Sequence, residues 1–170
     1  MTGAHSNSPI KLLWSGGWDS TFRLLTILLD ERKPVQPYYF IVPHHRKSTR
    51  NEREAREKIT KALLAKYSWT RDLLLPTVYV RMDQIAPDEE IKQAYKDAYE
   101  SQTIGVQYEF MARYCKQNNI QGMEIGLHKV GDPNVPPRFI QFLSRVGNSH
   151  TFSYNLALKD KPEYVFLKYF

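Results

Sequence analysis

The residues best able to do chemistry form a short run near the start of the chain, Ser15-Gly16-Gly17-Trp18-Asp19-Ser20-Thr21. This run follows a short apolar segment and precedes a helical pattern, so we expect a strand, a tight turn and a helix start. Glycine adopts backbone angles closed to other residues and leaves no side chain in the way of a ligand. The free N–H groups and the positive dipole end of a helix start attract anions. The local chemistry therefore predicts a phosphate site.

The polar side chains of the run add to such a site. Ser15, Ser20 and Thr21 supply hydroxyl groups, and Asp19 can either cap the helix or hold a cation. The run is neither Gly-x-x-x-x-Gly-Lys-Ser/Thr nor Gly-x-Gly-x-x-Gly, the two common nucleotide fingerprints. The alternative is an ordinary Gly-Gly turn with a Ser or Asp cap, and we favour the phosphate site over it.

The elements around this run alternate between strands and helices. Apolar runs predict strands over residues 10–14, 38–42, 77–82 and 123–127. Apolar periodicity predicts helices over residues 19–32, 49–67 and 106–117, with two more that open near 87 and 138. Such alternation implies a parallel sheet with helices on both faces and right-handed crossovers. The sequence therefore predicts an α/β, doubly wound, Rossmann-like fold, in one domain over residues 10–170 after a disordered lead-in of residues 1–9.

The helical patterns also predict which side chains are buried. In the first helix, the apolar residues expected on the sheet are Phe22, Leu24, Leu25, Ile27, Leu28 and Leu29. In the second, Thr49 and Glu52 are expected to form a capping box. The buried stripe of that helix is expected to contain Ala55, Ile59, Ala62, Leu63 and Tyr67. Its charged pairs expected in solvent are Glu52/Arg56, Glu54/Lys58 and Glu57/Lys61.

The composition narrows the classes of partner. The 24 basic residues against 18 acidic ones give a net charge of +6, which suits a polyanion such as ATP and would also suit RNA. No apolar segment approaches the length of a membrane span, and residues 1–9 lack the layout of a signal peptide, so we expect a cytoplasmic protein without a membrane partner. The single cysteine, Cys115, excludes an internal disulfide and lies in a helical pattern with Met111 and Ala112, where a buried structural thiol is expected.

Two further groups of residues leave alternatives open. The loop 43–47, which contains His44, His45, Arg46 and Lys47, leaves the carboxyl end of a predicted strand. Ligands bind at that edge of a parallel sheet, so the loop could face phosphate or an acidic substrate, or it could be a solvated loop. The tyrosines at 95, 99, 108 and 114 could stack on bases, but their helical spacing favours ordinary packing.

Residues 15–20 resemble the SGGxDS signature of the PP-loop ATP pyrophosphatases, with all five defined positions matched. A second region supports this family. Gly126-Leu127-His128, followed by Asp132 and by Pro137-Arg138-Phe139, resembles the segment after the fourth strand in 7-cyano-7-deazaguanine synthases and their relatives. The resemblance covers residues 10–143.

The resemblance implies an adenine-nucleotide α-hydrolase fold that binds ATP and Mg²⁺. The residues that it implies for ATP are Ser15, Gly16, Gly17, Trp18, Asp19, Ser20, Thr21, Tyr39, Phe40, Val42 and Gly126. The adenine would lie near residues 39–42, and Trp18 would pack beside the nucleotide or shield it. Asp19 and Asp132 would hold Mg²⁺, and Arg138 would hold a substrate anion, so these three residues are the expected catalytic group. The alternatives are that Asp132 is a turn residue before Pro133 and that Arg138 is a surface charge.

The family chemistry implied is ATP-dependent adenylation of a carboxylate or carbonyl oxygen, followed by attack of a nitrogen or sulfur nucleophile. The substrate would be a small molecule or an RNA. The chain lacks the zinc-binding cysteines of the deazaguanine synthases, so it is expected to be either a fragment or a branch with another substrate. The apolar tail, residues 164–170, could join a sheet or an interface with a second copy or a partner subunit. The alternatives to an enzyme are a non-catalytic ATP-binding or RNA-handling module and a nucleotide-binding subunit of a larger assembly.

Overall fold

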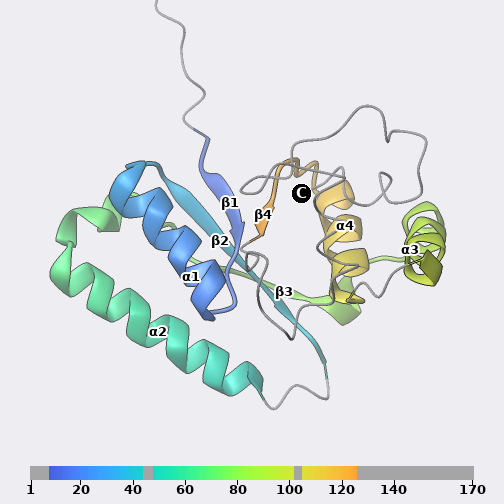
Figure 1. The fold of residues 1–170 in the computed structure, drawn as a ribbon, viewed down its shortest axis with the longest axis horizontal. Helices are drawn as coiled ribbons and strands as arrows, with labels where there is room; N and C mark the ends of the chain where they lie inside the picture. The colour runs from blue at the N-terminus through green and yellow to red at the C-terminus, as the bar shows by residue number, and fades with distance from the viewer. Residues whose placement is uncertain (1–7, 44–47, 102–104, 126–170) are drawn as a thin grey trace, which may run out of the picture. The chain divides into compact units, whose positions relative to one another are not determined.

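Figure 1 draws the protein as a computed structural model, which describes residues 8–43, 48–101 and 105–125. The chain forms two compact units, residues 1–80 and residues 81–170. Several predicted features lie outside the described residues, namely the lead-in up to residue 7, the loop 44–47, Gly126, Asp132, Arg138 and the tail 164–170. The single domain expected over residues 10–170 stays a prediction, because it includes residues that the structure does not describe.

The first unit alternates strands and helices as predicted. Its elements are β1 (Ile10–Leu13), α1 (Trp18–Leu25), a π-helical segment (Thr26–Asp30), β2 (Val35–Ile41), α2 (Ser48–Lys66), a 3-10 helix (Ser68–Asp72) and β3 (Val78–Arg81). The strands lie in the order β3-β2-β1, and β1 runs parallel to β2 with Leu12 opposite Pro37. The predicted α/β, Rossmann-like fold class, with a mostly parallel sheet, is confirmed.

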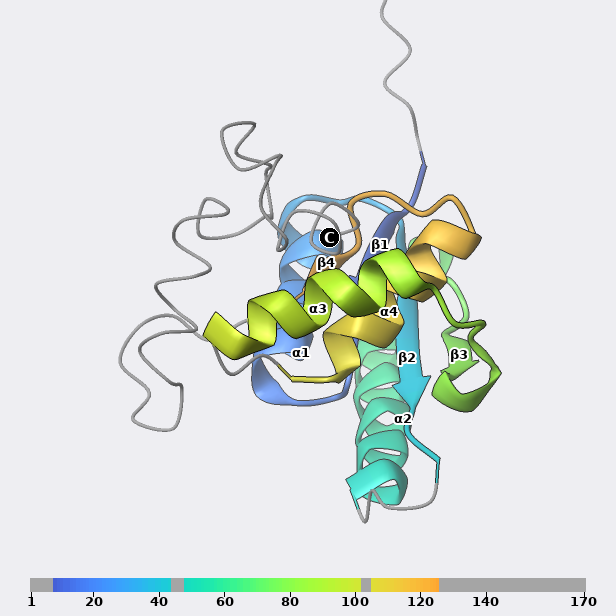
Figure 2. The ribbon, with the colours of Figure 1, turned by 90° about the vertical axis from the view of Figure 1, so that its right-hand side faces the viewer.

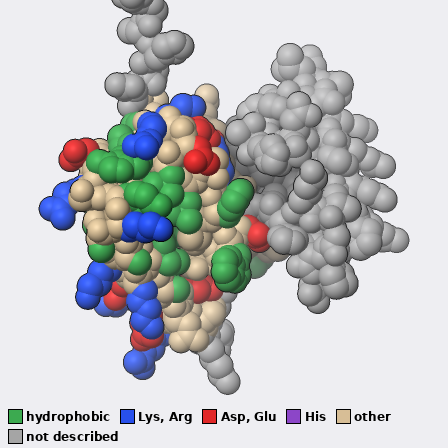
Figure 3. Space-filling model, turned by 60° about the vertical axis from the view of Figure 1, so that its left-hand side comes forward, with side chains coloured by type: hydrophobic (Ala, Val, Ile, Leu, Met, Phe, Trp, Pro, Cys, Tyr) green, Lys and Arg blue, Asp and Glu red, His purple; other side chains and the backbone are tan. Residues whose placement is uncertain are grey.

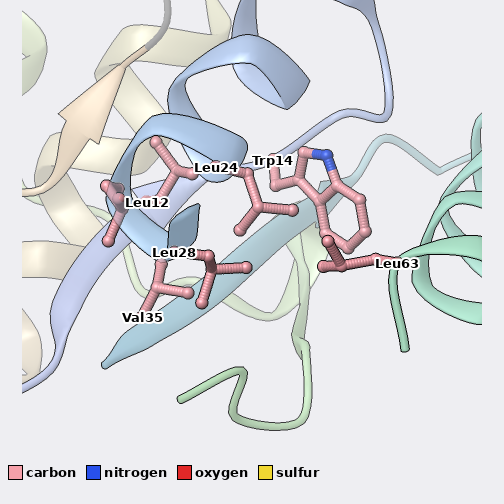
Figure 4. Close-up of a cluster of buried hydrophobic side chains, with 7 residues drawn as sticks. Leu12, Trp14, Leu24, Leu28, Val35 and Leu63 are labelled. Carbon is pink, nitrogen blue, oxygen red and sulfur yellow. The ribbon is translucent and has the colours of Figure 1, made fainter. Parts of the chain in front are cut away.

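The core of this unit joins both strands to both helices. The cluster consists of Leu12, Trp14, Leu24, Ile27, Leu28, Val35 and Leu63. Figure 4 shows the Trp14 ring beside Leu24 of α1 and Leu63 of α2. Burial of each such side chain stabilises the fold by about 1.5–3 kcal/mol relative to its exposure. Because Trp14 lies at the end of β1, this packing fixes where the chain turns toward α1.

The second strand begins earlier than predicted, at Val35, and contains Pro37 instead of following it. Proline lacks a backbone N–H and is usually confined to strand positions where no bond is lost. Here the bonds to β1 are made by its neighbours, among them the Tyr38 carbonyl, which accepts a hydrogen bond from the Trp14 N–H at 2.9 Å. The ladder therefore passes through Pro37 without losing a bond to β1.

Three details of the two helices differ from the sequence prediction. Phe22, expected on the sheet, is 74% exposed, because Leu24, Ile27 and Leu28 occupy the buried side of the helix. Ala62 is exposed on α2 for the same kind of reason, since Leu63 makes the contact with the core. The capping box is also wrong. α2 already begins at Ser48, and the Glu52 carboxylate accepts a hydrogen bond from the Tyr39 hydroxyl instead.

The second unit contains a short 3-10 helix (Met82–Gln84), α3 (Glu89–Ser101), α4 (Gln107–Gln117) and β4 (Glu124–Ile125). The residues predicted to face inward from α4 are all buried: Met111, Ala112 and Cys115. Figure 2 shows α3 and α4. Lys116 of α4 links the two helices, because its ammonium lies 2.6 Å from the Asp88 carboxylate and 2.9 Å from that of Glu90. Among the described residues, no helix has the length and apolar character that crossing a bilayer requires.

Asp88 gives this unit a testable pH dependence. Burial raises the pKa of its carboxyl, but hydrogen bonds from Lys116 and from the Ile91 N–H outweigh burial and hold the pKa below the usual 3.8. A lowered folded-state pKa stabilises the fold above the unfolded value, and this stability is lost as pH falls through the folded pKa. We expect Asp88→Asn to lower the unfolding free energy by about 1 kcal/mol at pH 7, because it removes the ion pair with Lys116 but can still accept from the Ile91 N–H. The stability of the variant should vary less than that of the parent as the pH falls below about 4. Urea unfolding at a series of pH values measures the unfolding free energy of both proteins. If the free energies of the parent and the variant depend on pH in the same way, the role of Asp88 is contradicted.

Candidate functional site

The strand, turn and helix start predicted around residues 15–20 are all present. β1 ends at Leu13, and α1 begins at Trp18. Gly16 has a φ of +86°, a conformation that favours glycine, and this sharp turn leads the chain from the strand into the helix. Gly17 is the N-cap of α1 in an extended conformation, and no side chain of the described residues caps the helix there. The start of α1 is therefore open at its backbone.

Hydroxyl groups brace the turn from within. The Ser15 Oγ accepts a hydrogen bond from the Gly17 N–H at 3.2 Å and lies 3.1 Å from the Ser20 Oγ. The Ser20 hydroxyl also donates to the Gly17 carbonyl at 3.3 Å. Farther along α1, the Thr21 Oγ1 accepts from the Trp14 indole N–H at 3.1 Å. The predicted hydroxyl groups thus fix the shape of the turn in this structure.

The backbone N–H groups of the turn are largely unused. The Thr21 N–H donates to the Gly17 carbonyl at 3.0 Å, which closes the first turn of the helix. Within the described part of the chain, no hydrogen bond uses the N–H groups of Gly16, Trp18 or Ser20. Unused donors at a helix N-terminus, together with the helix dipole, form an anion-binding arrangement.

The predicted metal ligands are only partly placed. Asp19 lies in the first turn of α1 and is half-buried. The residues that the structure describes contain no group of three or more His, Cys, Asp or Glu side chains arranged for a metal ion. Mg²⁺ is commonly held by one or two carboxylates together with substrate phosphates, so a single carboxylate such as that of Asp19 is enough for such a site.

The aromatic residues predicted near the nucleotide lie in contrasting surroundings. Trp18 is 93% exposed beside the turn, and Phe22 follows it at helical spacing. Tyr39 and Phe40 are buried in β2, and Val42 is half-buried after it. The Tyr39 ring is covered by the protein, so an adenine at residues 39–42 would meet the end of β2 and not this ring. The adenine position stays a prediction.

Arg56 of α2 is predicted from the sequence to face solvent, but it lies against the turn at Gly16. Arg56 is only 2% exposed, its Nη1 donates to the Ser15 carbonyl at 3.1 Å, and its Cζ lies 3.5 Å from the centre of the Tyr39 ring. The Tyr39 hydroxyl donates to Glu52 at 2.6 Å, and burial together with this bond raises the pKa of Tyr39. The expected solvent pair Glu52/Arg56 is therefore wrong.

The sequence did contain a signal for this burial. Arg56 precedes Ile59 by three residues and Leu63 by seven, so a helix brings all three to one face. Ile59 packs against the core cluster, and Leu63 belongs to it. The solvent side of α2 is instead marked by the pairs Arg50–Glu54 and Arg53–Glu57. Figure 3 shows Lys and Arg side chains interspersed with Asp and Glu along one edge of the molecule, which is typical of a solvated surface.

The two glycines of the turn have different surroundings. A Cβ on Gly16 would lie 3.0 Å from the Glu52 carbonyl oxygen and 3.0 Å from the Arg56 Cγ. Among the described residues, a Cβ on Gly17 would meet only the Ser15 Oγ, at 3.3 Å. Gly16 is therefore needed for the packing of α2 behind the turn, and Gly17 leaves the other side of the turn open.

This difference predicts separate effects for two alanine variants. We expect Gly16→Ala to destabilise the fold by about 1–3 kcal/mol, because it combines an unfavourable φ with a clash against the α2 backbone. Gly17→Ala should keep the unfolding midpoint close to that of the parent and weaken ATP binding by crowding the open side. Urea unfolding and calorimetric titration with ATP distinguish the two. Equal destabilisation by both substitutions would contradict this division of roles.

Comparison with known proteins gives no match: no family model, curated protein or solved structure matches this chain. The function must therefore be inferred from the turn, from the open start of α1 and from the residues packed behind them.

Proposed function

We propose that this protein is an ATP-dependent adenylating enzyme of the PP-loop ATP pyrophosphatase type, which converts ATP to AMP and pyrophosphate. The observation that carries this proposal is the open start of α1. A braced turn ends in a glycine N-cap without a side-chain cap, and the N–H groups of Gly16, Trp18 and Ser20 have no acceptor among the described residues. These donors occur in the run Ser15-Gly16-Gly17-Trp18-Asp19-Ser20, which resembles the family signature.

A polyphosphate suits this arrangement for three physical reasons. Backbone N–H groups that are already fixed in place bind developing negative charge without reorganisation. The positive end of the α1 dipole adds to their effect at short range. The open side of Gly17 allows a phosphate to approach the backbone itself. A chain with a net charge of +6 also attracts a highly charged anion over longer distances.

The proposed reaction has two steps. A carboxylate or carbonyl oxygen of the substrate attacks the α-phosphorus of ATP, the bond to the leaving pyrophosphate breaks, and an adenylate forms. A nitrogen or sulfur nucleophile then attacks the activated carbon, and AMP leaves with the oxygen. The turn acts in the first step, because its N–H groups meet the negative charge that collects on the leaving pyrophosphate. A place in the cytoplasm, where ATP is supplied, would suit this activity.

Asp19 is the described residue that could hold Mg²⁺ in this site. Asp19 lies in the first turn of α1, between Trp18 and Ser20 in the chain, and oxygen ligands are the ones that Mg²⁺ prefers. When bound, Mg²⁺ would neutralise part of the charge on the phosphates. Asp132 and Arg138 complete the proposed catalytic group from outside the described residues.

Pyrophosphate release tests the proposal directly. The protein is incubated with ATP, Mg²⁺ and a panel of carboxylic acids and carbonyl compounds, with ammonia or a thiol as nucleophile, and pyrophosphate and AMP are measured. We expect both products in equal amounts with at least one acceptor. ATP that binds and stays intact across the whole panel would favour a non-catalytic ATP-binding module.

The Asp19→Asn variant probes the proposed cation role. We expect turnover to fall by more than about 100-fold. Loss of a residue that only supports a metal ligand costs about 10- to 100-fold, and loss of a direct ligand should cost more. The unfolding free energy should change by less than about 1 kcal/mol, the size of one interaction with the helix dipole. Undiminished turnover in Asp19→Asn would refute the assignment of Asp19 to the metal.

A further inference from the structure

We propose that Arg56 is an anion-positioning residue of the same site. Its guanidinium orients the Ser15–Gly16 peptide toward the bound polyphosphate and places a buried positive charge behind it. This inference rests on the proposed function, because the anion is identified as the phosphates of ATP or the pyrophosphate product. It adds a residue from α2 to a site that the sequence resemblance confines to the turn, β2 and the later loops.

The first observation is that Arg56 is buried with most of its donors unused. It is 2% exposed, its Nη1 donates to the Ser15 carbonyl, and its Nε and Nη2 have no hydrogen-bond partner among the described residues. No ion pair to Arg56 forms within the described residues. A buried donor without an acceptor costs free energy, and an unbalanced buried charge costs more. The structure therefore holds a cation whose hydrogen-bonding capacity exceeds what its neighbours satisfy.

A second buried arginine in this chain shows the contrast. Arg113 of α4 is 8% exposed, and each of its three nitrogens has an acceptor. Its Nη1 donates to Glu109 at 3.0 Å, its Nη2 to the Ile85 carbonyl at 2.8 Å and its Nε to the Ala86 carbonyl at 3.1 Å. Such full pairing is what an arginine with a purely structural role requires. Arg56 lacks it.

The planarity of the peptide bond gives Arg56 a directional effect on the turn. The Ser15 carbonyl points toward Arg56, and the structure has no cis peptide bond among its described residues. In a trans peptide the N–H points opposite to the C=O, so the Gly16 N–H is directed away from the guanidinium. That N–H is one of the unused donors at the start of α1. Arg56 therefore holds a donor of the anion site in place.

The neighbours of Arg56 keep its guanidinium in this position. The Tyr39 ring lies 3.5 Å from its Cζ, and Tyr79 contributes a second, more distant ring at 5.6 Å. Tyr39 is itself fixed by its hydroxyl bond to Glu52, one turn before Arg56 on α2. The Arg56 Cγ is also in close contact with the Gly16 position. A positive charge held this tightly behind the turn favours a highly charged anion on the other side of the Ser15–Gly16 peptide.

Calorimetric titration with inorganic pyrophosphate, and separately with adenosine, tests the inference without any turnover. The variants are Arg56→Gln, which removes the charge, and Arg56→Lys, which keeps it. The matched control is Arg53→Gln, because Arg53 lies on the same helix with a side chain that is 68% exposed and paired with Glu57. Circular dichroism establishes that each variant is folded.

We expect Arg56→Gln to weaken pyrophosphate binding by about 10- to 100-fold, because it removes the buried charge and the charge-assisted hydrogen bond to the Ser15 carbonyl that orients the Ser15–Gly16 peptide. Arg56→Lys should give an intermediate affinity, and Arg53→Gln should bind as the parent does. The affinity for adenosine should not change in any variant. If Arg56 had only a structural role, Arg56→Gln would weaken the binding of both ligands or of neither. A folded Arg56→Gln that binds pyrophosphate as tightly as the parent overturns the inference.

The parent protein gives a second test if the Arg56 variants fail to fold. The side-chain Nε–H signal of Arg56 in an NMR spectrum should shift when pyrophosphate is added, and an unchanged signal at saturation overturns the inference. The proposed function fails separately. If pyrophosphate binding depends on Arg56 but no acceptor yields pyrophosphate from ATP, the adenylating activity is refuted and the anion site stands.

Discussion

The close packing of the Gly16 backbone against α2 is the contact on which the candidate site depends. A Cβ at Gly16 would lie 3.0 Å from both the Glu52 carbonyl oxygen and the Arg56 Cγ, so α2 would have to shift to admit it. The same contact brings the Arg56 guanidinium within reach of the Ser15 carbonyl. The packing of the Gly16 backbone against α2 therefore determines three features of the site. These are the shape of the turn, the direction of its N–H donors and the buried charge behind it. α2 is in turn held to the sheet through Leu63 and the core cluster.

The parts of the fold that the sequence predicted correctly are those determined by local patterns. The turn at residues 15–17 follows from two glycines between an apolar run and a helical period, and the buried face of α4 follows from spacing alone. Errors arose where tertiary contacts decide. Pro37 lies inside β2 because neighbouring residues make the bonds to β1, and Phe22 is exposed because other apolar residues cover the sheet. Neither outcome is visible in the local pattern.

Arg56 shows the same limit at the candidate site. Read pairwise, Glu52 and Arg56 are a favourable i,i+4 ion pair on a surface helix. In the structure each has a different partner, since Glu52 binds the Tyr39 hydroxyl and Arg56 binds the Ser15 carbonyl. Both partners come from strands or turns distant in sequence, so only the folded chain reveals them. A charge that shares a helical face with Ile59 and Leu63 is a useful sign of such a buried group.

The turn after β1 is proposed to bind a polyphosphate through its backbone, and amide NMR of the uniformly labelled protein can observe that binding at each N–H group. On titration with pyrophosphate, the amide signals of Gly16, Trp18 and Ser20 should shift with one common saturation curve. Gly122 also has a positive φ, with no atom of the described residues within 4 Å of a Cβ there, and its amide signal serves as the internal reference. Saturable shifts at the turn with a constant Gly122 signal are the predicted result. Amide signals of the turn that stay unchanged, or that shift no more than the Gly122 signal, would show that the turn does not bind polyphosphate.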